Sequence, residues 1–269
     1  MHEIVGNLEK EWSGKVSETK RISNTEYWNK RAEDYNDYIR TSDYEHGKKI
    51  KEVFEREEIL GENFEVLDIA AGPGSVTIPF AESVRKVFAI EPAEEMSKRL
   101  KNNSREREIL NIEIINKKWE EIDVEAYAHR FDLVVCSHAL WHFPDIAEQL
   151  KRINRVSRGY CCIAESVKDN NTFSDIYHTL GVDSQDFDHF IYLFNILHGI
   201  GIIANVKIID TVMRRSVYSG IRMWELFLSK YRTPSEKDRK IIREHVEQNS
   251  KDGIYERKGK MAVLWWKST

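Results

Sequence analysis

The sequence predicts an α/β fold built on a doubly wound, mostly parallel sheet, and three observations support this prediction. Short apolar runs alternate with helical patterns through the middle of the chain, which is the rhythm of βαβ units. One run, residues 131–136, is almost continuously apolar, as expected for a strand that is covered on both faces. The chain has 269 residues, 41% of them hydrophobic, which suffices for one large domain with additions.

The strands of this sheet are expected where short apolar runs lie between turn signals. They are residues 65–69, 86–90, 112–115, 131–136 and 159–164. Helices are expected between them, at residues 74–82, 93–103 and 144–156. Because ligands of such sheets bind at the carboxyl ends of the strands, the residues that follow each strand are the candidates for a functional site.

A helical segment, residues 1–60, precedes the first strand. Residues 1–24 are polar and are expected to be mobile or loosely packed. A helix is expected over residues 24–40, with Asn24 or Thr25 as its N-cap. Its large side chains recur at helical spacing: Trp28, Ala32, Tyr35 and Ile39. A second helix is expected over residues 43–59.

Residues 61–269 form the second unit, and its rhythm breaks after the fifth strand. Residues 166–204 are helical in character and are expected to form an insertion. The expected elements that follow are a strand at 205–212, a helix at 219–231, a helix to about residue 249 and a last strand at 260–266. The start of the second helix is marked by a capping box over residues 233–236, with Pro234 at the first helical position.

Composition excludes several classes of protein. The formal net charge is −4 and no long basic run is present, so nucleic acid is not an expected partner. No apolar run is long enough for a membrane span, and the N-terminus lacks the apolar core of a signal peptide. Cys136, Cys161 and Cys162 fall on expected strands, the last two on opposite faces, which favours reduced thiols in a cytoplasmic protein.

Residues 65–74, Glu-Val-Leu-Asp-Ile-Ala-Ala-Gly-Pro-Gly, are the most informative stretch. The first strand ends in an acid, Asp68, and a turn of small residues follows with Ala70, Gly72 and Gly74. Such a turn lets backbone N–H groups approach a ligand closely. A carboxylate at this place would repel a pyrophosphate, so it favours a ligand that carries a cationic or amine group.

This stretch resembles motif I of the class I S-adenosylmethionine-dependent methyltransferases, and among them the small-molecule enzymes of type 11/12. The resemblance implies S-adenosylmethionine as cofactor and a Rossmann-like sheet of seven strands, the last antiparallel. It also implies a helical lid from the N-terminal segment and from the insertion after strand five. A second acid should follow the second strand and bind the ribose hydroxyls, and Glu91 stands there. Pro92 follows, and Met96 takes the position that usually faces the adenosine.

The resemblance is weaker in the part of the expected cofactor site that would bind the adenine. Lys118 stands where an acid is expected to reach the adenine amino group, next to Trp119 and Glu120. Trp119 either packs on the purine or anchors the edge of the core. On the N-terminal helix, Tyr27 and Tyr35 are candidates to touch the cofactor, where an aromatic ring would attract the sulfonium.

Cys136, Ser137 and His138 follow the fourth strand and resemble motif IV, whose backbone borders the transferable methyl group. His138 is the candidate general base, although it could equally shape the pocket. His142 is expected to be structural. These residues also form a Cys-x-His-x₃-His set, but no metal site is predicted, because strand alternation does not make them converge.

The resulting prediction is methyl transfer from S-adenosylmethionine to a small-molecule acceptor by in-line displacement. A nicotinamide-dependent oxidoreductase is less favoured, since the Gly-x-Gly-x-x-Gly spacing is absent. A protein that binds the cofactor without turnover is the other alternative, and RNA or protein methyltransferases lack supporting motifs. The acceptor and the oligomeric state are not predicted.

Overall fold

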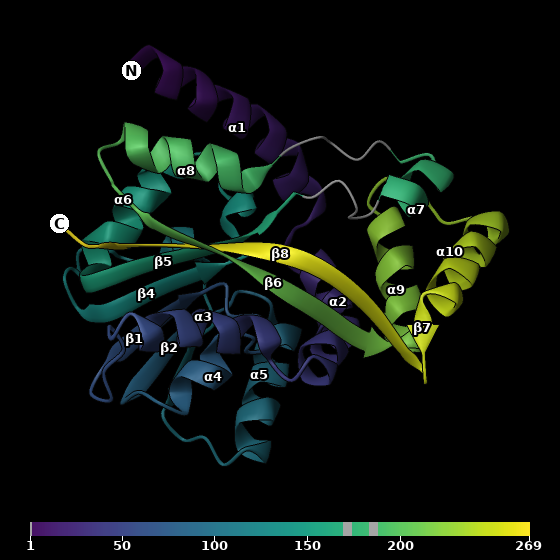
Figure 1. The fold of residues 1–269 in the computed structure, drawn as a ribbon, viewed down its shortest axis with the longest axis horizontal. Helices are drawn as coiled ribbons and strands as arrows, with labels where there is room; N and C mark the ends of the chain where they lie inside the picture. The colour runs from purple at the N-terminus through teal and green to yellow at the C-terminus, as the bar shows by residue number, and fades with distance from the viewer. Residues whose placement is uncertain (1, 169–173, 183–187) are drawn as a thin grey trace.

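The structure, a computed structural model, describes residues 2–168, 174–182 and 188–269. Its sheet has the order β3-β2-β1-β4-β5-β8-β6, with the short β7 beside β8 (Figure 1). The strands are β1 Glu65–Ile69, β2 Lys86–Ile90, β3 Ile112–Ile115, β4 Phe131–Ser137, β5 Ser157–Val167, β6 Asn205–Ser216, β7 Ser250–Lys251 and β8 Ile254–Lys267. The α/β fold and the antiparallel last strand, β8, are confirmed. β6 and β8 extend further than predicted, and β7 was not predicted.

The first five strands are parallel, so their carboxyl ends meet at one edge of the sheet. Asp68 lies beside Ala89 of β2, one residue pair before the end of both strands. Ser137 of β4 lies beside Ala164 of β5. The candidate residues that follow different strands are therefore brought to the same edge.

Helices cover both faces of the sheet. One face packs against α1 His2–Ile22, α6 Ile146–Val156 and α8 His189–Gly199, and the other packs against α3 Glu45–Arg56 and α4 Thr77–Ala81. Cys161 is buried in the first of these two cores and Cys162 in the second, which confirms the predicted alternation. Among the described helices, none is both long and apolar enough to cross a membrane.

The prediction of a loosely packed N-terminus is wrong, because residues 2–22 form α1 and dock on the sheet's helical layer. Trp12 and Val16 are fully buried, and Leu8 packs against the same core. The indole N–H of Trp12 donates to the carbonyl of Phe143 at 2.8 Å. Three apolar side chains spaced four residues apart make one narrow stripe, which the many charged residues between them obscure in the sequence.

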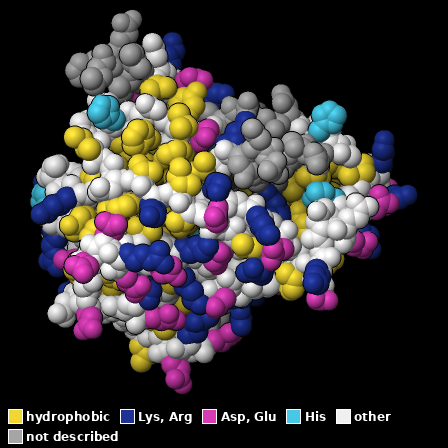
Figure 2. Space-filling view, in the orientation of Figure 1, with side chains coloured by type: hydrophobic (Ala, Val, Ile, Leu, Met, Phe, Trp, Pro, Cys, Tyr) yellow, Lys and Arg dark blue, Asp and Glu magenta, His cyan; other side chains and the backbone are white. Residues whose placement is uncertain are grey.

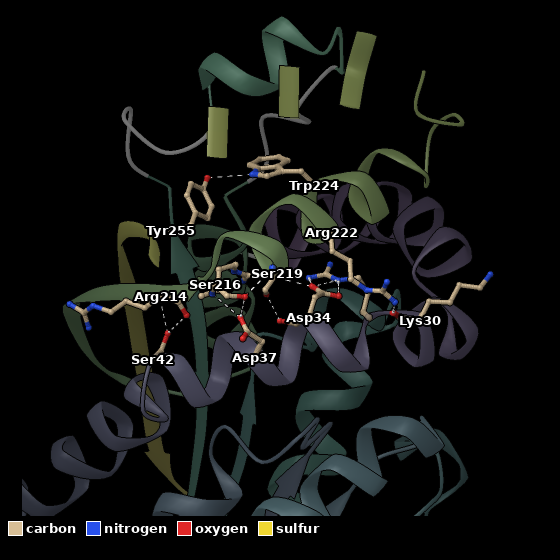
Figure 3. A network of polar contacts seen from close by, with 12 residues as sticks. Lys30, Asp34, Asp37, Ser42, Arg214, Ser216, Ser219, Arg222, Trp224 and Tyr255 are labelled. Atoms are coloured by element: carbon tan, nitrogen blue, oxygen red, sulfur yellow. Dashed lines mark hydrogen bonds and ion pairs between the residues drawn. The ribbon is translucent and has the colours of Figure 1, made fainter. Parts of the chain in front are cut away.

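Helix α2, Thr25–Thr41, begins at the predicted N-cap, where the side chain of Asn24 accepts from the backbone N–H of Tyr27. Buried polar contacts tie α2 to β6 and to α9, Val217–Leu228 (Figure 3). The Asp34 carbonyl accepts from the Ser219 hydroxyl at 2.8 Å, and the Asp37 carboxylate accepts from the backbone N–H of Ser216 at 2.9 Å. The N-terminal segment is thus fixed to the C-terminal part of the chain.

A second, smaller core lies at the far end of β6 and β8 from α1 (Figure 1). It joins α7 Ser174–Thr179, α9 and α10 Glu236–Gln248 to Tyr255 of β8. The predicted capping box of α10 is shifted by two residues: Ser235 is the N-cap and Asp238 is its partner. The shift has a physical reason, because Asp238 also binds Arg232 in an ion pair that fixes the start of the helix.

Candidate active site

A cavity of about 230 Å³ opens at the carboxyl edge of the parallel strands. Its walls come from the ends of β1, β2 and β4, from the start of α5, Glu94–Glu106, and from α2. The lining residues are Ser23, Asn24, Thr25, Trp28, Tyr35, Ala70, Gly72, Ile90, Glu91, Pro92, Ala93, Met96, Lys118, Trp119, Glu120, Ser137, His138, Ala139, His142 and Phe143. Most of the predicted site residues are among them.

Glu91 lines this cavity and fixes the loop that follows β1. One carboxylate oxygen accepts from the backbone N–H of Gly72 at 2.8 Å, and the other accepts from Ala93 at 2.7 Å. Each oxygen retains a further lone pair for a ligand hydroxyl. Burial raises the pKa of Glu91 to about 7.

The backbone of the loop is held in the left-handed region. Gly72 has a φ of 56°, and Ala70, which stands where a glycine is usual, has a φ of 60°. A non-glycine residue in this region is strained, and such strain gathers at functional sites. The turn it makes keeps large side chains away from this wall of the cavity.

Two predicted ligand-binding residues of the motif lie outside the cavity lining. The Asp68 carboxylate is buried and accepts from the hydroxyl of Thr77 at 2.5 Å, so it ties the end of β1 to the start of α4. Burial raises its pKa to about 7. Gly74 has a φ of 100°, and a Cβ there would lie 2.6 Å from the side chain of Leu100, which explains the glycine by close packing.

Trp119 belongs to a short 3₁₀ helix, Trp119–Glu121, at one end of the cavity. It is buried, and the guanidinium of Arg152 lies 5.2 Å from its ring. Trp119 therefore anchors the core and also lines the cavity, and its packing on a purine stays a prediction. Lys118 and Glu120 flank it on the same wall.

The face of α2 that meets the cavity carries Trp28 and Tyr35. Tyr27, predicted to touch the cofactor, is outside the lining. Its hydroxyl accepts from Arg31 at 2.9 Å, and its ring lies 4.3 Å from the ammonium of Lys230. Residues one apart on a helix face different directions, which separates Tyr27 from Trp28.

Ser137 and His138 line the opposite end of the cavity, whereas Cys136 is buried in the core beneath them. His138 also has a left-handed backbone, with a φ of 53°. Its Nδ1 lies 3.9 Å from a carboxylate oxygen of Glu165, at the end of β5. Burial, with a smaller contribution from His46, lowers the pKa of His138 to about 3. Burial raises the pKa of Glu165 to about 8.

Glu165 is a candidate that sequence reasoning missed. The predicted fifth strand stopped at residue 164, so the acid next to it was not considered. Asp68 and Glu91 were found as acids at strand ends, and the same rule applied to β5 would have found Glu165. Across the described residues, no three His, Cys, Asp or Glu side chains gather closely enough to hold a metal ion.

Comparison with known proteins agrees with this geometry. Residues 66–159, from β1 into β5, match the family of methyltransferase domains. An uncharacterized protein of Haemophilus influenzae is 22% identical over 208 residues, which cover 75% of each chain.

Two solved structures share the fold. One, from Bacillus halodurans and assigned to the methyltransferases, has 18% identity and a TM-score of 0.54 over 80% of this chain and 97% of its own. Another, from Galdieria sulphuraria and assigned as a sarcosine dimethylglycine methyltransferase, has 14% identity and a TM-score of 0.54 over 83% and 85%. The family match indicates methyl transfer as the chemistry of the domain.

Proposed function

We propose that this chain, a member of the class I S-adenosylmethionine-dependent methyltransferases, binds S-adenosylmethionine in the cavity and passes its methyl group to a small molecule. One observation carries the proposal above the others. Glu91 lines the cavity while its two oxygens hold the loop after β1 and the turn after β2. An acid fixed at this place is suited to accept from the two hydroxyls of a ribose.

The unpaired polar atoms of the cavity also favour a polar ligand. Trp28, Trp119 and His138 line it, and each has a buried ring nitrogen without a partner among the described residues. Buried polar nitrogens are normally paired, and leaving one unpaired costs about 1–3 kcal/mol. The heteroatoms of an adenosine and of an amino acid would supply partners, with the ring of Trp119 available to the purine.

The cofactor, when bound, supplies an activated methyl group, so the protein's own task is to position the acceptor and to exclude water. Ser137 and His138, which lie at the end of β4 beside the loop after β1, are the residues that we assign to the acceptor side. Trp28 and Tyr35 cover the cavity from α2 and keep it apolar on that side. A small molecule fits a cavity of this size and apolar lining better than a polymer does.

Calorimetry with S-adenosylhomocysteine, S-adenosylmethionine and NAD⁺ tests the proposal. We expect the first two to bind and Glu91→Gln to weaken both at least about tenfold, because the variant replaces a ribose-binding carboxylate oxygen with an amide NH₂. The matched control is Glu94→Gln, an exposed acid three residues further along the chain. Binding of NAD⁺ alone, or equal affinities in both variants, would refute the assignment.

Turnover needs a separate experiment. Methyl-labelled S-adenosylmethionine is incubated with the protein and a broad set of small acceptors, and label transfer is measured. Tight binding with no labelled product from any acceptor would favour a protein that binds the cofactor without turnover.

A further inference from the structure

Lys230 is a partly buried lysine just beyond the C-terminal end of α9. Its ammonium is surrounded by aromatic rings and lies 4.3 Å from the ring centre of Tyr27, 5.6 Å from that of Phe227 and 5.9 Å from that of Trp141. Within the described part of the chain, this ammonium makes no hydrogen bond and no ion pair. The rings attract the charge, but they do not replace the water that three N–H groups lose, so the ammonium still lacks an acceptor.

The charged groups near Lys230 do not balance its charge. Burial lowers the pKa of Lys230 to about 7, with a smaller contribution from the guanidinium of Arg31 on α2. Asp34, a buried acid one turn along α2, is already held by Arg31 in an ion pair at 2.8 Å. Nη1 of buried Arg215, from β6, lies 3.7 Å from the same carboxylate and has no hydrogen-bond partner among the described residues. One carboxylate is thus shared by two guanidiniums, and this region carries an excess of positive charge that an anion would offset.

A series of ring contacts links the ammonium of Lys230 to the cavity. Trp141 lies in the loop after β4, and its indole N–H donates to the carbonyl of His138 at 2.8 Å. The ring of Trp141 stacks on that of His142, with 3.9 Å between centroids, and lies 6.2 Å from that of Trp28. His142 and Trp28 both line the cavity. Lys230 therefore lies next to the part of the cavity that we assign to the methyl acceptor.

We propose that Lys230 binds a carboxylate of the methyl acceptor, and that the acceptor is therefore a small organic acid whose nucleophilic atom lies at Ser137 and His138. The inference rests on the proposed function and adds the class of acceptor. A carboxylate suits this place better than a phosphate, because one ammonium among aromatic rings offers a single positive charge and few hydrogen-bond donors. The rings keep water from the ion pair, which strengthens the attraction between its charges.

The experiment follows Lys230 by NMR of protein labelled with ¹³C at the lysine Cε atoms. The signal is identified by its loss in Lys230→Met, which removes the charge and nearly keeps the side-chain volume, so the variant should fold. Acetate, succinate and benzoate are added to the complex with S-adenosylhomocysteine at constant ionic strength, each compared with its neutral amide. We expect at least one carboxylate to raise the pKa of Lys230 by about one pH unit or more, which corresponds to a tenfold preference for the ammonium form, and the amides to leave it unchanged.

A second measurement compares acceptors that take up label from methyl-labelled S-adenosylmethionine. Each should be an acid whose amide reacts at least about tenfold more slowly in kcat/KM, with the difference mainly in KM, because the carboxylate holds the acceptor and does not take part in the displacement. The preference for the acid should disappear in Lys230→Met. The matched control is Lys240→Met, which removes an exposed lysine of α10 and should keep the preference.

A Lys230 signal whose midpoint none of the three carboxylates moves, or moves no more than that of Lys240, overturns the inference. A midpoint that responds to inorganic phosphate and not to the carboxylates also overturns it, and so does an acceptor whose amide reacts as fast as its acid. These results leave the proposed function standing. The proposed function fails instead if S-adenosylhomocysteine does not bind, which the same samples show by calorimetry.

Discussion

The free energy of unfolding of the ligand-free Glu165→Gln variant should rise relative to that of wild type as the pH rises. The folded-state pKa of Glu165 is about 8, raised by burial from 4.5. A raised pKa means that the acid's contribution to stability is fully present below its unfolded value and is lost as the pH rises through its folded value. Gln has the same shape and cannot ionise, so the variant does not suffer this loss.

The magnitude follows from linkage. Between about pH 5 and pH 8, the shift costs the wild type on the order of 3 kcal/mol of unfolding free energy. The titrations of Asp68, Glu91 and His46 are shared by the two proteins and largely cancel in their difference, and His138, with a folded-state pKa of about 3, stays neutral over this range in the folded protein. The pH dependence of the difference therefore reports on Glu165, whatever its value at any single pH.

The assay is urea unfolding followed by tryptophan fluorescence at about pH 5, 6.5 and 8. We expect the free energy of Glu165→Gln minus that of wild type to rise steadily over this range, while the exposed control Glu148→Gln gives a flat line. A difference that is constant, or that falls with pH, would refute the view that Glu165 is buried without a strong cationic partner.

Three further substitutions test other parts of the structure. Gly74→Ala should lower the free energy of unfolding by about 1–3 kcal/mol, because its Cβ would meet Leu100, whereas Gly253→Ala, also at positive φ but in open space, should cost about 1 kcal/mol. Thermal unfolding compares the two, and equal losses would contradict the packing role of Gly74. Trp12→Ala should cost about 3–5 kcal/mol and weaken S-adenosylhomocysteine binding, because α1 holds Phe143 of the cavity wall; a change no larger than that of exposed Leu110→Ala would speak against the docking of α1. Asp34→Asn should cost about 3–5 kcal/mol in urea unfolding, because it leaves the buried Arg31 without its partner, whereas breaking the exposed Glu26–Lys30 pair with Glu26→Gln should change stability by less than about 1 kcal/mol; similar effects would refute the burial argument.

Much of the sheet could be predicted because its signals are local. The apolar runs of β1, β2 and β3 and their bounding turns fixed these strands to the residue, and Asn24 marked the start of α2. β6 and β8 were predicted too short because their remaining residues, 213–216 and 254–259, are rich in charged side chains and hold no continuous apolar run. α1 was missed because its stability comes from a tertiary contact, the burial of Trp12, rather than from propensity.

The candidate site was also predictable only in part. The placement of Glu91, Gly72 and His138 at one edge of the sheet could be predicted, since each follows a parallel strand and these strands end at that edge. Position did not reveal where each carboxylate points. Asp68 turns to the Thr77 hydroxyl and Glu165 to His138, and both choices depend on side chains that are distant in sequence or on another strand.

The length of β6 and β8 has a mechanical consequence. β5 pairs with β8 only as far as Lys260, while β6 continues alongside β8 to Ile254, so a two-stranded ribbon projects beyond the sheet and carries the small core around Trp224 (Figure 1). Because two paired strands connect the small core to the sheet, its movement relative to the sheet is more restricted than it would be with a flexible linker. Figure 2 shows acidic and basic side chains interspersed over this face of the molecule. Ser23 and Asn24, which connect α1 to α2, line the cavity.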